Sequence, residues 1–247
     1  MCGRYASSAG RTELTEIFEI DEVEGPLPAP AWNIAPTDPV PAIFQRQRPQ
    51  GCRRLLTEVR WGLVPSWSKD ARGASRLINA RVETVGEKPA FRKAFASRRC
   101  LLPADGYYEW YTLPGAGGGK PVKQPVFISP ADGGPFAMAG LYEFWKVPDG
   151  SWLTTATVIT TSATDEVGHL HDRMPMSVPA ENWSAWLDPG FGSDARALLT
   201  VPVSGLAFHP VSTAVNKVAN DGPELVEPLA LHGLARGRQR ERAGRVH

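Results

Sequence analysis

The chain has 247 residues, of which 42% are hydrophobic and 21% charged, a composition typical of a globular protein with one sizeable core. It contains no run of about 18 uncharged apolar residues and no apolar leader, so we expect a cytoplasmic protein with no membrane partner, and a monomer. The net charge of +1 points neither to nucleic acid nor to an acidic partner.

The charge is unevenly distributed. Residues 236–247 contain five arginines and one glutamate, a net +4, so the rest of the chain carries −3. A groove for DNA must therefore be a local basic patch. The three cysteines, Cys2, Cys52 and Cys100, lack CxxC spacing and a histidine cluster, so we expect no disulfide, no metal and no cofactor. Cys52 and Cys100 are interpreted as buried or half-buried thiols.

The predicted elements begin with a helix at residues 11–18, where Leu14, Ile17 and Phe18 recur at helical spacing before the prolines of residues 26–30. Extended segments dominate the middle of the chain, and they lie at residues 40–45, 55–61, 100–102, 107–112, 125–128, 136–145, 152–161 and 206–212. Helical patterns occur near residues 89–97, 180–187 and 194–199, and residues 115–119 form a turn. Because strands and long helices do not alternate, we predict a mostly antiparallel α+β domain.

Cys2 would become the first residue of the chain if Met1 is removed, as methionine aminopeptidases do before a small side chain. A free α-amine titrates near about 7.7–8 and a thiol near about 8.5, so both are partly nucleophilic at neutral pH. A 1,2-aminothiol condenses with an aldehyde to a Schiff base, and thiol attack then closes a thiazolidine ring. An abasic deoxyribose offers such an aldehyde. Taken alone, however, Cys2 is more simply a residue that packs against the body of the protein.

Six segments form a motif set, which pattern reasoning alone would assign largely to loops. They are residues 1–5 (MCGRY), 32–37 (WNIAPT), 61–67 (WGLVPSW), 78–84 (INARVET), 106–110 (GYYEW) and 169–175 (HLHDRMP). In this order and spacing they resemble the SRAP family of abasic-site DNA processors. The likeness spans roughly residues 2–228, and residues 215–221 are similar to the family's C-terminal end.

The resemblance implies one SRAP-type domain over residues 1–232, without Met1. Its β core is expected to be mostly antiparallel and barrel-like, flanked by short helices. The chain departs from the family after residue 228, and we expect residues 233–247 to be a basic, disordered tail.

Glu109 is a catalytic candidate from the residues themselves. In an extended segment it shares a face with Tyr107 and Tyr111, and a carboxylate among aromatic rings is desolvated, which raises its pKa. The alternative is a surface glutamate on a half-exposed strand. The resemblance makes Glu109 the acid and base of Schiff-base and ring formation.

The resemblance assigns the other catalytic roles. It selects His171, rather than the competing His169, as the group that helps to open the sugar ring, although a lone histidine is more often structural. Asn79 would orient the abasic sugar, two residues from Arg81 on the same face of an extended segment. An asparagine in a turn beside a solvated arginine is the alternative.

The DNA-binding candidates are residues that could contact phosphates or stack on bases. Arg4, Arg81 and Arg173 are expected at phosphates, and Asn33 and Pro36 in a loop that lines the cleft. Trp67 and Trp110 are expected to stack on bases that flank the lesion, although most of the eight tryptophans belong in a core.

The resulting hypothesis is a protein that binds single-stranded DNA containing abasic sites and forms a stable thiazolidine crosslink with it during the DNA-damage response. Reversal of the crosslink and strand incision as a lyase are secondary activities that the resemblance implies. Two alternatives remain open. One is a thiol autopeptidase that removes its own N-terminal residue, and the other is a single-strand DNA reader without covalent chemistry.

Overall fold

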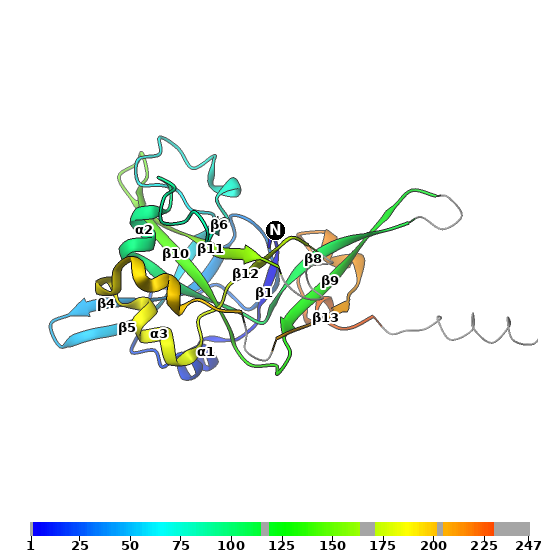
Figure 1. The fold of residues 1–247 in the computed structure, drawn as a ribbon, viewed down its shortest axis with the longest axis horizontal. Helices are drawn as coiled ribbons and strands as arrows, with labels where there is room; N and C mark the ends of the chain where they lie inside the picture. The colour runs from blue at the N-terminus through cyan, green and yellow to red at the C-terminus, as the bar shows by residue number, and fades with distance from the viewer. Residues whose placement is uncertain (1, 115–118, 164–170, 202–204, 230–247) are drawn as a thin grey trace, which may run out of the picture.

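The core is a closed five-stranded barrel with further strands attached to it (Figure 1). The computed structural model describes residues 2–114, 119–163, 171–201 and 205–229. The barrel follows the order β11, β10, β7, β4, β5, and parallel pairing of Thr155 with Arg60 and of Ala156 with Trp61 closes it. Its strands are β4 (Pro39–Arg48), β5 (Gly51–Trp61), β7 (Arg99–Ala104), β10 (Phe136–Lys146) and β11 (Trp152–Ser162).

Three short strands extend the barrel sheet at its edges. They are β2 (Glu22–Glu24), which runs parallel to β5, β6 (Asn79–Arg81), which runs parallel to β11, and β12 (Arg173–Pro175), which pairs antiparallel with β11. Two of them, β6 and β12, carry residues of the motif set. Because β6 and β12 both pair with β11, these two distant parts of the sequence lie beside the same strand.

A second, fully antiparallel sheet lies beside the barrel. Its order is β13 (Leu206–Pro210), β9 (Val122–Pro130), β8 (Gly106–Leu113), β1 (Tyr5–Ser7) and β3 (Ala31–Ile34). The hairpin formed by β8 and β9 projects from the body as an arm (Figure 1). The α+β class and the antiparallel, barrel-like core expected from the sequence are thus confirmed.

Buried hydrophobic residues form two layers, one inside the barrel and one on its outer side. Alternate residues of β10 face opposite sides, as the pleat of a strand requires: Met138 belongs to the inner cluster, whereas Ala139 and Leu141 belong to the outer one. Short helices cover the outer layer, among them α1 (Arg11–Ile17), α2 (Arg92–Ser97), α3 (Trp183–Leu187), η4 (Ala180–Asn182) and η5 (Pro189–Leu198). The further 3-10 helices are η1 (Ala74–Arg76), η6 (Thr213–Asn216) and η7 (Pro223–Leu225).

The predicted elements and the observed ones differ mainly in the short segments. Every predicted strand is present and most are longer than expected; β6 agrees with the extended segment expected at Asn79 and Arg81, whereas β1, β2, β3 and β12 are additional. The helix expected at residues 194–199 belongs to the 3-10 run η5. Cys52 is exposed, so its interpretation as a buried or half-buried thiol was wrong. The turn residues 115–118, His169 and the basic tail lie outside the described residues.

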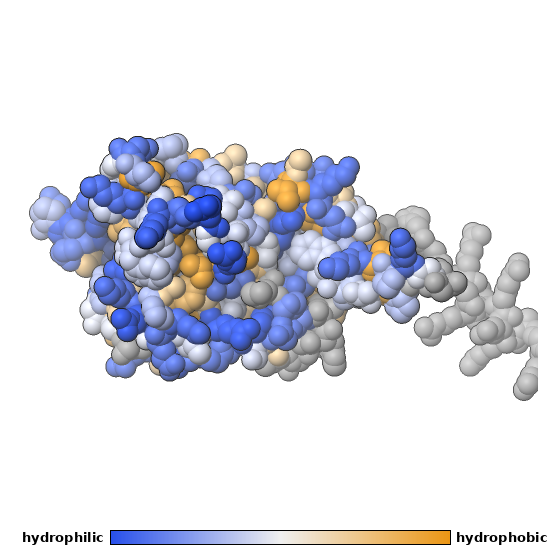
Figure 2. Space-filling view, turned by 90° about the horizontal axis from the view of Figure 1, so that it is seen from above, coloured by the Kyte–Doolittle hydropathy of each residue, from blue (hydrophilic) through white to orange (hydrophobic). Residues whose placement is uncertain are grey.

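The surface seen from above is mostly hydrophilic, with scattered apolar areas (Figure 2). None of the helices in the described part of the chain has the length and apolar character needed to cross a membrane. Among the same residues, no cluster of three or more His, Cys, Asp or Glu side chains could hold a metal ion.

Arg99 of β7 links the short helices α2, α3 and η5 to the barrel by hydrogen bonds. Its side chain is buried and donates to the carbonyl oxygens of Phe95 (2.7 Å), Trp186 (2.7 Å) and Gly192 (3.1 Å). It also donates to the carbonyls of Ala96 and Asp188. One guanidinium therefore satisfies carbonyls at the C-terminal ends of α2 and α3 and in the η5 run.

We predict that Arg99→Met lowers the free energy of unfolding by about 3 kcal/mol, because several carbonyls lose a charged donor at once. Urea denaturation measures this loss. The control is Arg92→Met on the exposed side of α2, which should change stability by less than about 0.5 kcal/mol. Equal effects of the two variants would contradict the role given to Arg99.

Candidate functional site

Cys2 lies at the junction of the two sheets. Strand β1 runs between β3 and β8, with Tyr5 paired to both Ile34 and Tyr107. This pairing carries the residues before β1 into the inner core, where Cys2 is fully buried. The side-chain amide of Asn79 donates a 2.7 Å hydrogen bond to the carbonyl oxygen of Cys2. The residue expected to orient the abasic sugar thus contacts Cys2 directly.

The Cys2 thiol is protonated at neutral pH in this structure. Burial raises its pKa well above the ordinary value, and the negative charge of Glu109 adds to the effect. Burial also raises the pKa of the Tyr107 hydroxyl, which the charges of Cys2 and Glu109 raise further. Nucleophilic attack by this sulfur therefore needs a nearby group that accepts its proton.

Glu109 has the properties of such a group. It lies on β8 with 4% of its surface exposed, and burial raises its pKa to about 7. The desolvation inferred from its aromatic neighbours in the sequence is therefore observed. At neutral pH the carboxyl exists in both protonation states, which suits a group that accepts and returns a proton.

His171 lies just before β12 and is half-buried. Its Nδ1 is 3.0 Å from the backbone N–H of Arg173 and 2.7 Å from Oδ1 of Asp172. The first contact needs a lone pair on Nδ1 and the second needs a proton. Burial lowers the pKa of His171, which favours the neutral ring at neutral pH.

Strand β6 holds Asn79 and Arg81 as the sequence suggested. The two flank the fully buried Ala80, so their side chains share the opposite face, and Arg81 is exposed. The carbonyl of Ile78 accepts from the Trp61 indole and from the Val158 backbone, which fixes the start of the strand. Oδ1 of Asn79 is buried and has no partner among the described residues.

An open cleft of about 520 Å³ has Glu109 and His171 in its lining. Its lining combines four predicted residues with two that the sequence analysis had not selected, and consists of Arg4, Glu109, Trp110, Lys123, His171 and Asn216. Lys123 is exposed on β9, opposite Thr112 of β8. An isolated lysine in a strand carries no sequence signal for binding; only the pairing of β8 with β9 brings it to the cleft.

The indole of Trp110 is held from two sides. Its Nε1 donates to Oδ1 of Asn216 at 2.7 Å, and the Arg4 guanidinium lies 5.8 Å from the ring centroid. The same arginine donates to Oδ1 of Asn33 at 2.7 Å and to the Val215 carbonyl at 3.0 Å. Residues 215–216 therefore fix the orientation of both predicted DNA-binding side chains.

Asn33 is buried and is not among the residues that line the cleft. Its amide contacts the carbonyls of Val215, Lys217 and Asn220, and so anchors the C-terminal loop. Pro36 is half-buried in a tight loop in which Thr37 has a φ of 79°. A β-branched residue with this φ is strained, and strain of this kind concentrates at functional sites.

The other two candidates lie outside the cleft lining. Trp67 is 68% exposed in the segment after β5, where its ring is open to stacking. Arg173 is buried and forms a two-bond ion pair with Glu83, at 2.7 and 2.9 Å, and it also donates to the Thr160 carbonyl. This engagement disfavours the phosphate contact expected for Arg173 and indicates that it fixes β12 against β11.

Comparisons with known proteins identify the family of the chain. The chain belongs to the SOS response associated peptidase (SRAP) family, whose profile matches residues 1–218. It is 38% identical over 232 residues to the abasic site processing protein YoqW of Bacillus subtilis (strain 168), covering 92% of this chain and 99% of YoqW.

A vertebrate relative and a solved structure extend the comparison. The chain is 33% identical over 270 residues to the abasic site processing protein HMCES of Gallus gallus, covering 94% of this chain and 79% of the relative. A crystal structure of a protein from Bacteroides thetaiotaomicron has the same fold, with a TM-score of 0.76 and 22% identity over 93% of this chain and 100% of that one.

The raised pKa of Glu109 predicts a stability change with pH. Between about 4.5 and 7 the folded carboxyl keeps a proton that the unfolded chain has lost. Stability from this group is therefore complete below about 4.5 and is lost as the pH rises through about 7. Relative to Glu109→Gln, the wild-type protein should lose about 3 kcal/mol of unfolding free energy across this window, since each pH unit corresponds to about 1.4 kcal/mol.

Urea unfolding of both proteins at pH 4.5, 6 and 8 gives this difference, and other carboxyl groups cancel in the comparison. A constant difference between the two proteins from pH 4.5 to 8 would show that Glu109 titrates normally.

Proposed function

We propose that the protein processes abasic sites in single-stranded DNA by forming a covalent thiazolidine between Cys2 and the open-chain sugar. The observation that carries the proposal is the hydrogen bond of Asn79 to Cys2 together with the interaction of Cys2 with Glu109, which lines an open cleft with Arg4 and Trp110. The printed names of the relatives, abasic site processing proteins, support the same substrate.

The first step is opening of the sugar. The C1′–O4′ bond of the closed hemiacetal breaks, O4′ takes up a proton and the C1′ hydroxyl gives one up. His171 and Glu109 both line the cleft and could serve these two transfers. A half-buried histidine with a lowered pKa and a carboxyl with a pKa of about 7 can both exchange protons near neutrality.

The second step joins protein and sugar. Release of Met1 gives Cys2 the free α-amine, which adds to the C1′ aldehyde, and loss of water leaves an imine. The sulfur then adds to the imine carbon, while its proton passes to the imine nitrogen by way of Glu109. The sum is one aldehyde and one aminothiol giving one thiazolidine and one water. The bond from Asn79 to the Cys2 carbonyl holds the nucleophile during both additions.

The cleft also has an aromatic ring and positive charges that could contact a DNA strand. Trp110 offers an aromatic ring of fixed orientation, and Arg4 and Lys123 place positive charge beside it. This combination is typical of proteins that bind single strands, where bases stack on aromatic rings and cations lie along the backbone. The overall charge of +1 does not oppose this, because the positive charge is local.

A second candidate function is a thiol autopeptidase, which the family's description as a peptidase favours. The buried, protonated Cys2 thiol argues against general proteolysis, because a peptidase thiol needs a lowered pKa. We propose that the relevant cleavage is limited to the release of Met1, which prepares Cys2 for crosslinking.

We predict a heat-stable crosslink on a denaturing gel when the protein meets single-stranded DNA containing uracil together with uracil glycosylase, and none without the glycosylase. Cys2→Ala should abolish the band and keep weak binding, whereas the exposed Cys52→Ala is the matched control and should keep the band. Glu109→Gln should slow band formation by about 100-fold or more.

The same gel separates the rival functions. Weak binding with no band from a protein whose N-terminus is Cys2 would favour a non-covalent reader. Release of new fragments from a supplied peptide substrate in a Cys2-dependent way would favour the peptidase. A chain with an uncleaved extension before Cys2 should form no band, because its α-amine is then an amide.

We predict that Lys123→Gln weakens binding to single-stranded DNA and lowers the slope of log affinity against log salt by about 0.7, the value for one lost phosphate contact. Fluorescence anisotropy at several salt concentrations measures both. Lys93→Gln, an exposed substitution on α2, is the control and should leave the slope unchanged. An unchanged slope for Lys123→Gln would remove this residue from the DNA path.

A further inference from the structure

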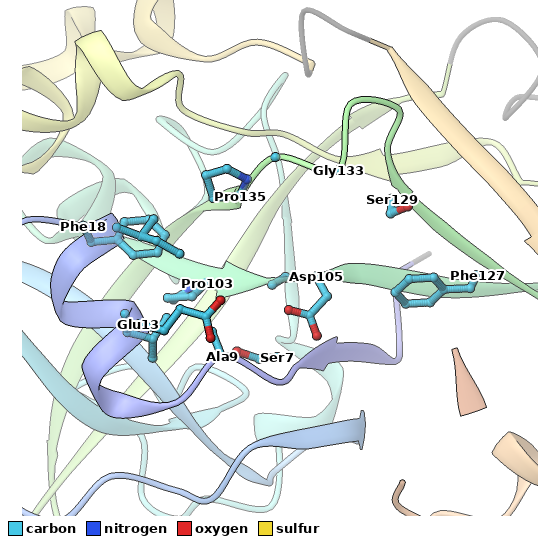
Figure 3. A pocket seen from close by; sticks show the side chains of 14 residues that line it. Ser7, Ala9, Glu13, Phe18, Pro103, Asp105, Phe127, Ser129, Gly133 and Pro135 are labelled. Carbon is cyan, nitrogen blue, oxygen red and sulfur yellow. The ribbon is translucent and has the colours of Figure 1, made fainter. Parts of the chain in front are cut away.

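A second pocket, separate from the cleft, lies between α1, the turn after β7 and strand β9 (Figure 3). Its volume is about 280 Å³, and it contains none of the residues that line the cleft. The pocket begins where β1 ends, at Ser7, whereas Cys2 lies before the start of the same strand. The length of β1 therefore separates the two sites.

Two carboxylates from different elements face this pocket. Glu13 comes from the first turn of α1 and Asp105 from the turn between β7 and β8, and Figure 3 shows both carboxyl groups in the middle of the hollow. Asp105 is anchored, since its Oδ2 accepts the backbone N–H of Ser8 at 2.8 Å. Burial raises the pKa of Asp105 and the charge of Glu13 adds to this, so a cation placed here would stabilise the ionised form.

A buried hydroxyl gives an independent indication of a ligand. Ser7 lines the pocket with only 4% of its surface exposed, and its Oγ has no hydrogen-bond partner within the described residues. In Figure 3 this hydroxyl is drawn below the Glu13 and Asp105 carboxyl groups, which line the same pocket. Buried polar groups in folded proteins are normally satisfied, so a hydroxyl without a partner beside two carboxylates indicates a missing polar ligand.

The remaining walls are apolar and include two aromatic rings. Phe18 and Phe127 stand on opposite sides of the carboxylates, and Pro103 and Pro135 complete the walls (Figure 3). Aromatic rings beside carboxylates favour a cation that is planar and weakly hydrated and that carries an aliphatic stem. A guanidinium meets these requirements better than an ammonium, because it stacks on rings and bonds carboxylates through two parallel N–H groups.

We propose that this pocket binds an alkylguanidinium group, with Glu13 and Asp105 as its anionic partners, Ser7 as a further hydrogen-bonding partner and the phenylalanine rings around its stem. The group would come either from an arginine side chain of another polypeptide or from a free guanidine compound. The site is independent of the crosslinking reaction, so the two can be tested separately.

The test is titration of the full-length protein, labelled with nitrogen-15, with arginine blocked at both ends as N-acetyl-arginine N-methylamide. We expect saturable shifts of the Gly106 and Gly134 amides, with a dissociation constant on the order of 1 mM, typical of so small a ligand. The blocked citrulline analogue has nearly the same shape without the charge, and should bind at least 10-fold more weakly.

Variants of the two carboxylates test whether the ligand binds in this pocket. Glu13→Gln and Asp105→Asn should each weaken binding at least 10-fold, and the second substitution keeps a side-chain oxygen that can still accept from Ser8, which protects the fold. Glu16→Gln, on the exposed side of α1, is the matched control and should bind as the wild type does. All three variants should crosslink abasic DNA at the wild-type rate, so failure here and failure of the proposed function are distinguishable.

Agmatine distinguishes the two sources. Binding as tight as that of blocked arginine supports a site open to free guanidines, whereas binding of the blocked arginine alone supports an arginine within a polypeptide. Equal binding of arginine and citrulline, wild-type affinity in both pocket variants, or no shifts at 10 mM ligand would overturn the proposal.

Discussion

The hydrogen bond from the Asn79 amide to the Cys2 carbonyl is the contact on which the proposed chemistry depends. It joins two parts of the sequence 77 residues apart, and each is held by its own sheet. Strand β1 is fixed between β3 and β8, and strand β6 is fixed by parallel pairing to β11. The first residues of the chain, which usually fray, are thereby given a defined position at the junction of the sheets.

Burial makes the groups at this junction reactive, and it also lowers the free energy of unfolding of the protein. Elsewhere two buried arginines have close partners: the Arg99 guanidinium donates to several carbonyl oxygens, and Arg173 pairs with Glu83. Around Cys2, by contrast, the Tyr5 and Tyr107 hydroxyls and Oδ1 of Asn79 have no partners among the described residues, and the Glu109 carboxyl has a pKa of about 7. Polar groups kept ready for a substrate reduce stability, and the well-packed barrel offsets this loss.

The sequence predicts the long elements well, because a run of about ten alternating residues leaves a clear pattern. It also predicts the desolvation of Glu109, since the aromatic neighbours lie in the same strand. Strands of three residues, such as β1, β6 and β12, leave no such pattern; β6 and β12 form because β11 offers them an edge. The burial of Asn33 and the pairing of Arg173 depend on distant partners, and Lys123 reaches the cleft only through the register of β8 and β9.

In the proposed reaction the amine and the sulfur of one residue, Cys2, both bond to the sugar carbon. Mass spectrometry of the crosslinked protein after protease and nuclease digestion shows whether they do. We expect that the peptide beginning at Cys2 carries the abasic sugar with loss of one water, and that borohydride leaves this mass unchanged because a thiazolidine has no imine to reduce. A sugar found on a lysine, or on a peptide that still contains Met1, would rule out this reaction.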